Sequence, residues 1–220
     1  MNVEGSVGAV IFDFDGTLAK LNINFPRMRK AVVDLVESYG VPVDGLRDLY
    51  VLEMVDAGML FIAQKHPGQE HHFLRQANDV ITDIEIAAAT RGELVEGTRE
   101  MLRELKKRSI KTGVITRNCQ MAVVQVFPDI HEYCNPVITR EFTRNVKPHP
   151  EHLLSALAFL NVLPQHAFMV GDHPMDIKIG KDAGTFTIGV LSGYSTSGDL
   201  LKAGADIILD RADEILGILR

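Results

Sequence analysis

The sequence predicts an α/β fold, in which a doubly wound parallel sheet is interrupted by an inserted all-helical domain. Three observations lead to this prediction. Short apolar runs rich in β-branched residues recur along the chain and have the length of buried strands. Segments with apolar residues at helical spacing separate several of these runs, as expected where helices connect parallel strands. One long stretch, from residue 19 to residue 92, shows helical spacing and no convincing buried strand.

Six apolar runs are the predicted strands of the sheet. In chain order they are residues 8–12, 112–116, 136–139, 167–171, 186–190 and 206–209. Residues 98–108 and 151–160 repeat apolar side chains at helical intervals and are predicted helices. The apolar face of the second helix is expected to consist of Leu153, Leu154, Leu157 and Leu160.

The long helical stretch falls between the first and second strands, so it is interpreted as an insertion. One apolar stripe in it consists of Met28, Val32, Leu35 and Val36. Gly58 and the segment His66-Pro67-Gly68 have the residue types of turns between helices. The predicted domains are therefore an α/β core of residues 1–18 and 93–220 and a helical cap of residues 19–92.

Composition and charge limit the class of protein. The 220 residues are 46% hydrophobic and 24% charged, which is ordinary for a globular protein that buries its own core. The net charge of −6 gives no general attraction for nucleic acid or an anionic membrane. Cys119 and Cys134 are too few for a disulfide framework and lack metal-ligand spacing. With no signal peptide or membrane-spanning run in view, we expect a cytoplasmic protein, either a monomer or a small homo-oligomer.

Polar side chains lie just after four of the predicted strands, at the strand end or in the loop that follows. Asp13 and Asp15 end the first strand, Thr116 the second, and Asp172 and Asp176 follow a later one. Lys147 lies in the loop after residues 136–139. Ligands of parallel sheets bind beyond the carboxyl ends of the strands, so these groups are expected to converge.

Carboxylates gathered at one place repel one another unless a cation binds among them. Oxygen ligands without Cys or His favour Mg²⁺. A magnesium site beside a lysine and a hydroxyl suits a phosphoryl group, and a carboxylate is able to attack phosphorus directly. The residues thus indicate phosphoryl chemistry at the sheet edge.

Four ordered motifs carry a family resemblance: Asp13-Phe14-Asp15-Gly16-Thr17-Leu18, Thr116, Lys147-Pro148, and Gly171-Asp172 with Asp176. In this order they resemble the motifs of the haloacid dehalogenase-like (HAD) superfamily, over roughly residues 5–18 and 93–210. The resemblance implies a Rossmann-like core. In position and helical character, the insertion is similar to the caps of the branch that contains phosphoglycolate phosphatases and β-phosphoglucomutases.

The resemblance also implies catalytic roles. Asp13 would be the nucleophile, and Asp15 would protonate the leaving oxygen and then activate the hydrolytic water. Lys147 would counter the charge of Asp13 and of the phosphoryl group. Thr116 and Arg117 would bind phosphate oxygens, although Arg117 stands where the family commonly has Asn.

The implied cofactor is Mg²⁺. Its expected ligands are Asp13, the backbone carbonyl of Asp15, and Asp172, with Asp176 binding directly or supporting the site through water. Asp176 and the phosphate-binding candidate Thr116 have plain structural alternatives: Asp176 would also suit the first turn of a helix, and Thr116 would suit the cap of a helix beginning near Cys119.

The sequence leaves the roles of two sets of side chains in the insertion undecided. The histidines His66, His71 and His72 have no acidic or Cys partner that completes a metal site, and a solvated surface explains them better. The basic side chains Arg27, Arg29 and Lys30 either recognise a second anionic group of the substrate or form a charged outer face.

The predicted function is hydrolysis of a small phosphomonoester, such as phosphoglycolate or a sugar phosphate, through an aspartyl-phosphate. A lid-like cap would favour small substrates. One alternative is a phosphosugar mutase, although Asp15-Gly16-Thr17 leans toward hydrolysis. Another is a catalytically idle binding or regulatory protein, which predicts the loss of an essential group, and none is lost. Dehalogenation is disfavoured because Asp15 is present.

Overall fold

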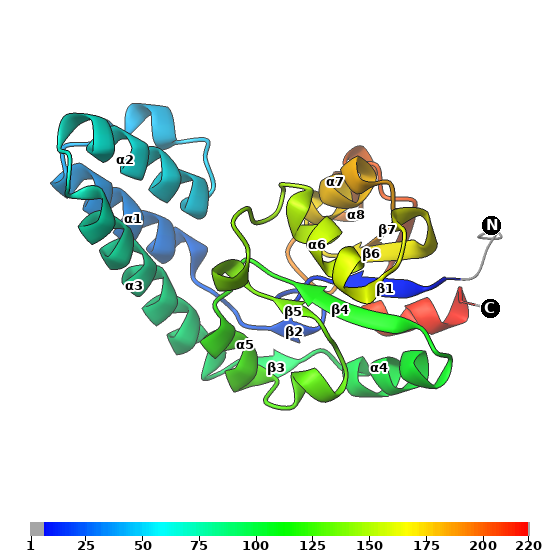
Figure 1. Ribbon diagram of the computed structural model, residues 1–220. Coiled ribbons are helices and arrows are strands. Elements are labelled where there is room, and N and C mark those ends of the chain that lie inside the picture. Colours follow the sequence, from blue (N-terminus) through cyan, green and yellow to red (C-terminus); the bar gives the residue numbers. More distant parts are fainter. Residues whose placement is uncertain (1–6, 220) are drawn as a thin grey trace. The chain divides into compact units, whose positions relative to one another are not determined.

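A computed structural model describes residues 7–219, so the outer limits 1 and 220 of the predicted core lie outside the described residues. The chain divides into two compact units: one is formed by residues up to 21 and from 91 onward, the other by Asn22–Thr90. Within the described residues, every helix is too short or too polar to span a bilayer. Figure 1 labels the helices and strands of both units.

The first unit contains a six-stranded parallel sheet, which confirms the predicted fold class. The spatial order is β5-β4-β1-β6-β7-β8, and each neighbouring pair is parallel. The strands are β1 (Ala9–Phe12), β4 (Lys111–Ile115), β5 (Val137–Ile138), β6 (Ala167–Gly171), β7 (Phe186–Val190) and β8 (Ile207–Leu209). Each overlaps one of the six apolar runs, because strands covered on both faces need apolar residues at every position.

Helices cover both faces of this sheet. In Figure 1, α6 (Glu151–Leu160) and α7 (Pro174–Ala183) lie on one side, and α4 (Thr98–Lys107) with the 3₁₀ helix η5 (Ala212–Gly217) lies on the other. Ala9 and Ile11 of β1 pack with the buried leucines of α6, because alternate residues of a strand point to the same face. The other helices of this unit are α5 (Gln120–Val126), α8 (Ser197–Lys202), η2 (Ile130–Glu132), η3 (Arg140–Phe142) and η4 (Pro164–His166).

The prediction for the buried face of α6 was wrong at one position. Leu154 is 41% exposed, whereas His152 and Ala156 are buried beside Leu153 and Leu157. Leucines occupy too many adjacent positions of this helix for their spacing to fix which edge of the stripe faces the sheet.

A second, two-stranded sheet was absent from the sequence prediction. β2 (Ala19–Lys20) pairs antiparallel with β3 (Glu93–Leu94), with Ala19 opposite Leu94 and Lys20 opposite Glu93. Two-residue strands carry no readable period, so a pattern search passes over them. Their pairing joins the chain segments on either side of the inserted unit.

The inserted unit consists of three α-helices that pack on one another: α1 (Phe25–Ser38), α2 (Val51–Lys65) and α3 (Glu70–Ala89), with the short η1 (Asp44–Leu46) between the first two. The predicted turn at His66-Pro67-Gly68 is confirmed, and Gly68 has φ +94°. The predicted turn at Gly58 was wrong. Gly58 lies inside α2, where a Cβ atom would come within 2.9 Å of Phe73 Cζ and 3.1 Å of Val36 Cγ1.

Candidate active site

The order of the sheet places β1 at the point where the direction of winding changes. The chain passes from β1 to β4 and β5 on one side, then to β6, β7 and β8 on the other. Loops diverge at the carboxyl end of such a strand, which opens a crevice there. Asp13 is the first residue after β1, and its N–H donates to Val170 O of β6 at 2.9 Å.

Lys147 joins two of the predicted carboxylates. Its ammonium donates to Asp13 Oδ1 at 2.5 Å and to Asp176 Oδ1 at 2.7 Å. All three side chains are buried, Lys147 with 3% and Asp176 with 0% of its surface exposed. The other oxygen of Asp176 accepts from His173 N–H at 3.1 Å, within the capping box that begins α7. Asp176 therefore has the structural role weighed from the sequence, because it lies in the first turn of a helix. It also holds the lysine, and its predicted part in magnesium binding stays a prediction.

Asp172 is the third buried carboxylate. One oxygen each from Asp13, Asp172 and Asp176 lies within 4.8 Å of the others. Tyr194 N–H, in the loop after β7, donates to Asp172 Oδ2 at 2.9 Å. Glycine is required on two sides of the Asp172 carboxylate, because Cβ atoms at Gly16 and Gly193 would collide with it. Gly16 also has φ +90°, a conformation that favours glycine.

The Asp15 carboxylate lies outside this three-carboxylate cluster. Leu21 N–H donates to Asp15 Oδ1 at 2.8 Å, which orients the carboxyl group from the chain just after β2. The Ser192 hydroxyl donates to Gly16 O at 2.7 Å and so ties the turn after Asp15 to the loop after β7. A side-chain metal-binding role for Asp15 gains no support from this arrangement, and its predicted backbone role stays a prediction.

Burial opposes ionisation of the clustered acids. Burial raises the pKa of Asp13 to about 6; the Lys147 ammonium acts in the other direction, and the charge of Asp176 adds to the rise. Burial raises the pKa of Asp172 to about 8, and the charges of Asp13 and Asp176 raise it further. Burial would lower the pKa of Lys147, but Asp13 and Asp176 outweigh it and the pKa is raised. The lysine is thus a cation at neutral pH.

The cluster fits a divalent cation. Three carboxylates face one ammonium, so full ionisation leaves two negative charges without compensation. The donor atoms are all hard oxygens, which suits Mg²⁺ or a similar ion rather than a soft transition metal. A divalent ion would balance the charge and favour the ionised form of the buried carboxylates.

Thr116 and Arg117 follow β4 as predicted, and the hydrogen bonds of their side chains are to other groups of the protein. Thr116 Oγ1 donates to Asn118 Oδ1 at 2.8 Å and accepts from Asn118 N–H at 3.1 Å. The Arg117 guanidinium donates to Lys147 O and lies 3.6 Å from Met175 Sδ. Thr116 does not cap the next helix: α5 begins at Gln120, and its cap is Cys119, whose Sγ accepts from Ala122 N–H. Phosphate binding by Thr116 and Arg117 stays a prediction.

The sequence analysis missed Ser192, Gly193, Tyr194 and His152. The first three follow β7, whose apolar run was recognised, so extending the strand-end rule to that strand would have found them. His152 had no such signal, because it stands at the edge of a leucine-rich helix and its hydrogen bonds are to backbone atoms, Lys147 N–H and Ile138 O.

The basic side chains and histidines of the inserted unit, whose roles the sequence left undecided, make structural contacts or are exposed within that unit. Arg29 donates to the backbone carbonyls of Leu46, Arg47 and Leu49 and so stabilises the end of η1. Lys30 pairs with Asp34 on α1. The three histidines are exposed, and among residues 7–219 they belong to no group arranged for a metal ion.

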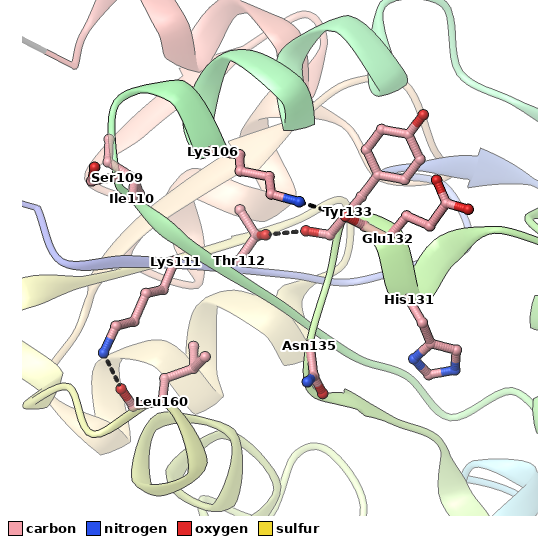
Figure 2. Close-up of a pocket in the computed structure, with 10 residues that line it drawn as sticks. All are labelled: Lys106, Ser109, Ile110, Lys111, Thr112, His131, Glu132, Tyr133, Asn135 and Leu160. Carbon is pink, nitrogen blue, oxygen red and sulfur yellow. Dashed lines mark hydrogen bonds between the residues drawn. The ribbon is translucent and has the colours of Figure 1, made fainter.

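A cavity of about 340 Å³ lies elsewhere in the first unit. Figure 2 shows Lys106, Lys111 and Thr112 around it, each donating to a backbone carbonyl. Lys111 and Thr112 begin β4, whereas Thr116 follows its other end. The cavity is therefore at the amino end of this strand and is separate from the carboxylate cluster.

Known proteins are similar to this chain over much of its length. The family model described as haloacid dehalogenase-like hydrolase matches residues 10–190. The pyrophosphatase PpaX of Bacillus cereus is 36% identical over 129 residues, 58% of this chain and 60% of that protein. A haloacid dehalogenase-like hydrolase domain-containing protein of Arabidopsis thaliana is 30% identical over 187 residues, 84% of this chain and 71% of that protein.

Solved structures share the fold at low sequence identity. A protein described as a predicted phosphoglycolate phosphatase of Haemophilus somnus has a TM-score of 0.67 at 18% identity, covering 99% of this chain and 100% of that one. A hydrolase of Pseudomonas syringae has a TM-score of 0.70 at 19% identity, covering 96% of each chain.

Proposed function

The chain belongs to the haloacid dehalogenase-like hydrolases, and on that basis we propose that it is a Mg²⁺-dependent phosphatase that hydrolyses a small phosphomonoester through an aspartyl-phosphate on Asp13. The observation that carries the proposal is the ion pair between Lys147 and Asp13 inside the buried cluster of Asp13, Asp172 and Asp176. This arrangement combines a carboxylate nucleophile, a fixed cation and a set of metal-binding oxygens at one strand end.

In the first step, an Asp13 oxygen attacks phosphorus, and the bond between phosphorus and the ester oxygen breaks. Lys147 lies at hydrogen-bonding distance from Asp13 and offsets negative charge as it develops. Asp15 donates a proton to the departing oxygen, which leaves as an alcohol. The Leu21 N–H bond keeps the Asp15 carboxyl oriented for this transfer.

In the second step, Asp15 takes a proton from water as the water oxygen attacks phosphorus of the aspartyl-phosphate. Inorganic phosphate departs, and the Asp13 carboxylate is regenerated. Asp13 and Asp172 would hold the magnesium ion with the main-chain carbonyl of Asp15, while Asp176 supports Lys147. When bound, Mg²⁺ supplies positive charge that stabilises the phosphoryl oxygens and aligns them for attack.

The proposed substrate class is a small metabolite phosphate. The burial of Asp13, with 7% of its surface exposed, supports a small ester over a phosphoprotein. Similar proteins carry the names pyrophosphatase and phosphoglycolate phosphatase. The chain spans 60% of the length of the first of these, so neither activity is transferred as such.

The test is phosphate release from a panel of phosphoglycolate, pyrophosphate and sugar phosphates, with Mg²⁺ and with EDTA. Wild-type protein is expected to release phosphate only with Mg²⁺, and Asp13→Asn to lower kcat by at least ~10³-fold because it lacks the nucleophile. Asp182→Asn, on the exposed side of α7, is the matched control and should leave kcat unchanged.

Other results would point elsewhere. Metal-dependent phosphate release that persists in Asp13→Asn would show that Asp13 is not the nucleophile. A phosphosugar mutase would instead isomerise a sugar phosphate with little phosphate released. An idle binding protein would turn over nothing on the panel.

A further inference from the structure

His152 connects the catalytic loop to the sheet through two hydrogen bonds. It is the second residue of α6 and is completely buried. Its Nδ1 accepts from Lys147 N–H at 3.2 Å, and its Nε2 lies 3.0 Å from Ile138 O. A carbonyl oxygen only accepts, so the ring proton is on Nε2 and the imidazole is neutral. Burial agrees with this state, because it lowers the pKa of His152 to about 4.

The backbone of Lys147 has no regular secondary structure to fix it. Residues 143–150 form bends and turns between η3 and α6. Both main-chain polar groups of Lys147 are instead held by side chains: the N–H by His152 and the C=O by Arg117. Ile138, the other partner of His152, is the last residue of β5 and pairs with Ile115 of β4. The imidazole therefore links the loop to a fixed point of the sheet.

We propose that His152 is a positioning residue for Lys147. Its neutral ring holds the main chain of Lys147 where the ammonium reaches both Asp13 and Asp176. This inference rests on the proposed function, since it gives Lys147 its charge-stabilising part in phosphoryl transfer. A displacement of about 1 Å in such a group costs on the order of 10²-fold in rate.

The chemistry of the position explains why histidine stands there. The site needs an acceptor toward Lys147 N–H and a donor toward Ile138 O, both buried, and a neutral imidazole supplies the two on opposite sides of one rigid ring. Asparagine would place an oxygen near the position of Nδ1 and keep the acceptor. Glutamine would place its amide near Nε2 and keep the donor. Leucine has neither group.

The experiment compares His152→Asn, His152→Gln and His152→Leu in the full chain with Mg²⁺ and the best substrate of the panel. His152→Leu and His152→Gln are expected to lower kcat by roughly 10- to 100-fold with KM changed less than about threefold, because Lys147 loses its main-chain anchor. His152→Asn should keep kcat within about threefold of the wild-type value. The melting temperature of each variant is measured alongside.

Thr112→Val is the matched control for loss of a side-chain hydrogen bond to backbone. It removes the 2.6 Å bond from Thr112 Oγ1 to Tyr133 O at the amino end of β4. It should lower the melting temperature and leave kcat unchanged. If the His152 variants lower kcat only in proportion to their loss of stability, or if His152→Asn is as slow as His152→Leu, the positioning role is wrong.

A second readout does not depend on turnover. In ¹⁵N NMR of the wild-type imidazole, a neutral ring protonated at Nε2 is expected across the neutral pH range. A proton on Nδ1 would overturn the inference even in an active enzyme. A wild-type protein that releases no phosphate from the panel would instead overturn the proposed function, and the positioning role with it, so the two failures are distinguishable.

Discussion

At the scale of single residues, charge balance controls the candidate site. Lys147 neutralises part of the negative charge of Asp13, Asp172 and Asp176, but one ammonium cannot balance three carboxylates. Burial is the largest cause of the raised pKa values of Asp13 and Asp172, and the charges of the neighbouring carboxylates add to the rise. A pKa that differs between the folded and unfolded states makes stability depend on pH.

The metal-free protein is therefore expected to lose stability as pH rises. The pKa of Asp172 is about 8 in the folded state and 3.8 in the reference state, so its favourable contribution is complete below about pH 4 and lost as pH rises through 8. In EDTA, the free energy of unfolding should fall by about 2 kcal/mol between about pH 6.5 and pH 8.5. Urea denaturation at each pH measures it.

Two comparisons make this prediction specific. Saturating Mg²⁺ should abolish or reverse the trend, because the ion binds the ionised carboxylates and stabilises the folded state by mass action. Asp172→Asn should flatten the trend in EDTA, since the titrating group is gone. The pKa of His152 is about 4 in the folded state, below its reference value of 6.5. Its contribution to stability therefore has the opposite pH dependence and is lost only below that reference pH. A wild-type curve in EDTA that is flat above about pH 6.5 would contradict the charge argument.

Some residues of the candidate site could be identified from the sequence, and others could not. Asp13, Lys147, Asp172 and Asp176 were identified because the carboxyl ends of parallel strands meet, and the structure brings them together. His152 was out of reach because its partners are backbone atoms of Lys147 and Ile138, and no side-chain pattern encodes such a contact. The structural contacts of Thr116 and Arg117 were equally hidden.

At the scale of elements, periodicity located the long helices and the buried strands. The prediction failed at Gly58, where the residue type favours a turn but the packing of the helices favours a continuous helix. Glycine weakens a helix interior, so a turn was the natural interpretation. The helix continues because α1 and α3 approach α2 there, and Phe73 and Val36 leave no room for a side chain. Close packing of helices thus outweighed the local preference for a turn.

Gly58→Ala is expected to destabilise the protein by about 1 kcal/mol. Alanine gains about 1 kcal/mol in helix propensity, but the Cβ atom forces Phe73 or Val36 to move, at a cost of about 1–3 kcal/mol. Chemical denaturation of the full chain measures the difference. The matched control is Gly45→Ala in η1, where a Cβ meets nothing within 4 Å and stability should hold or rise slightly. Equal stability of the two variants would show that the contact at Gly58 is not tight.

At the scale of the whole molecule, the chain contains one continuous unit, Asn22–Thr90, within a discontinuous one. All members of the carboxylate cluster and Lys147 belong to the discontinuous unit. Sequence reasoning anticipated an insertion from the missing strands, but it placed β2 inside the insertion, since two residues are too short for a strand signal.

Replacing Asn22–Thr90 by a short glycine-containing turn is expected to leave the discontinuous unit folded. Its sheet and helices contain their own buried core, and β2 already lies beside β3 at the point of excision. The shortened chain should unfold cooperatively by circular dichroism and should melt at a higher temperature with Mg²⁺ than with EDTA. The same chain with Asp172→Asn should lose most of that difference. A non-cooperative transition would show that the core needs the inserted unit to fold.

The pairing of β2 with β3 also bears on how this chain tolerates change during evolution. The free-energy cost of closing a flexible loop grows only with the logarithm of its length, by about 0.6 kcal/mol for each doubling. Lys20 and Glu93 stand opposite each other in the strand pair that flanks the inserted unit. Insertions, deletions and wholesale replacement between these two residues are therefore expected to leave the spacing of Asp13, Asp172 and Lys147 intact, so that selection is able to remodel one unit without retuning the other.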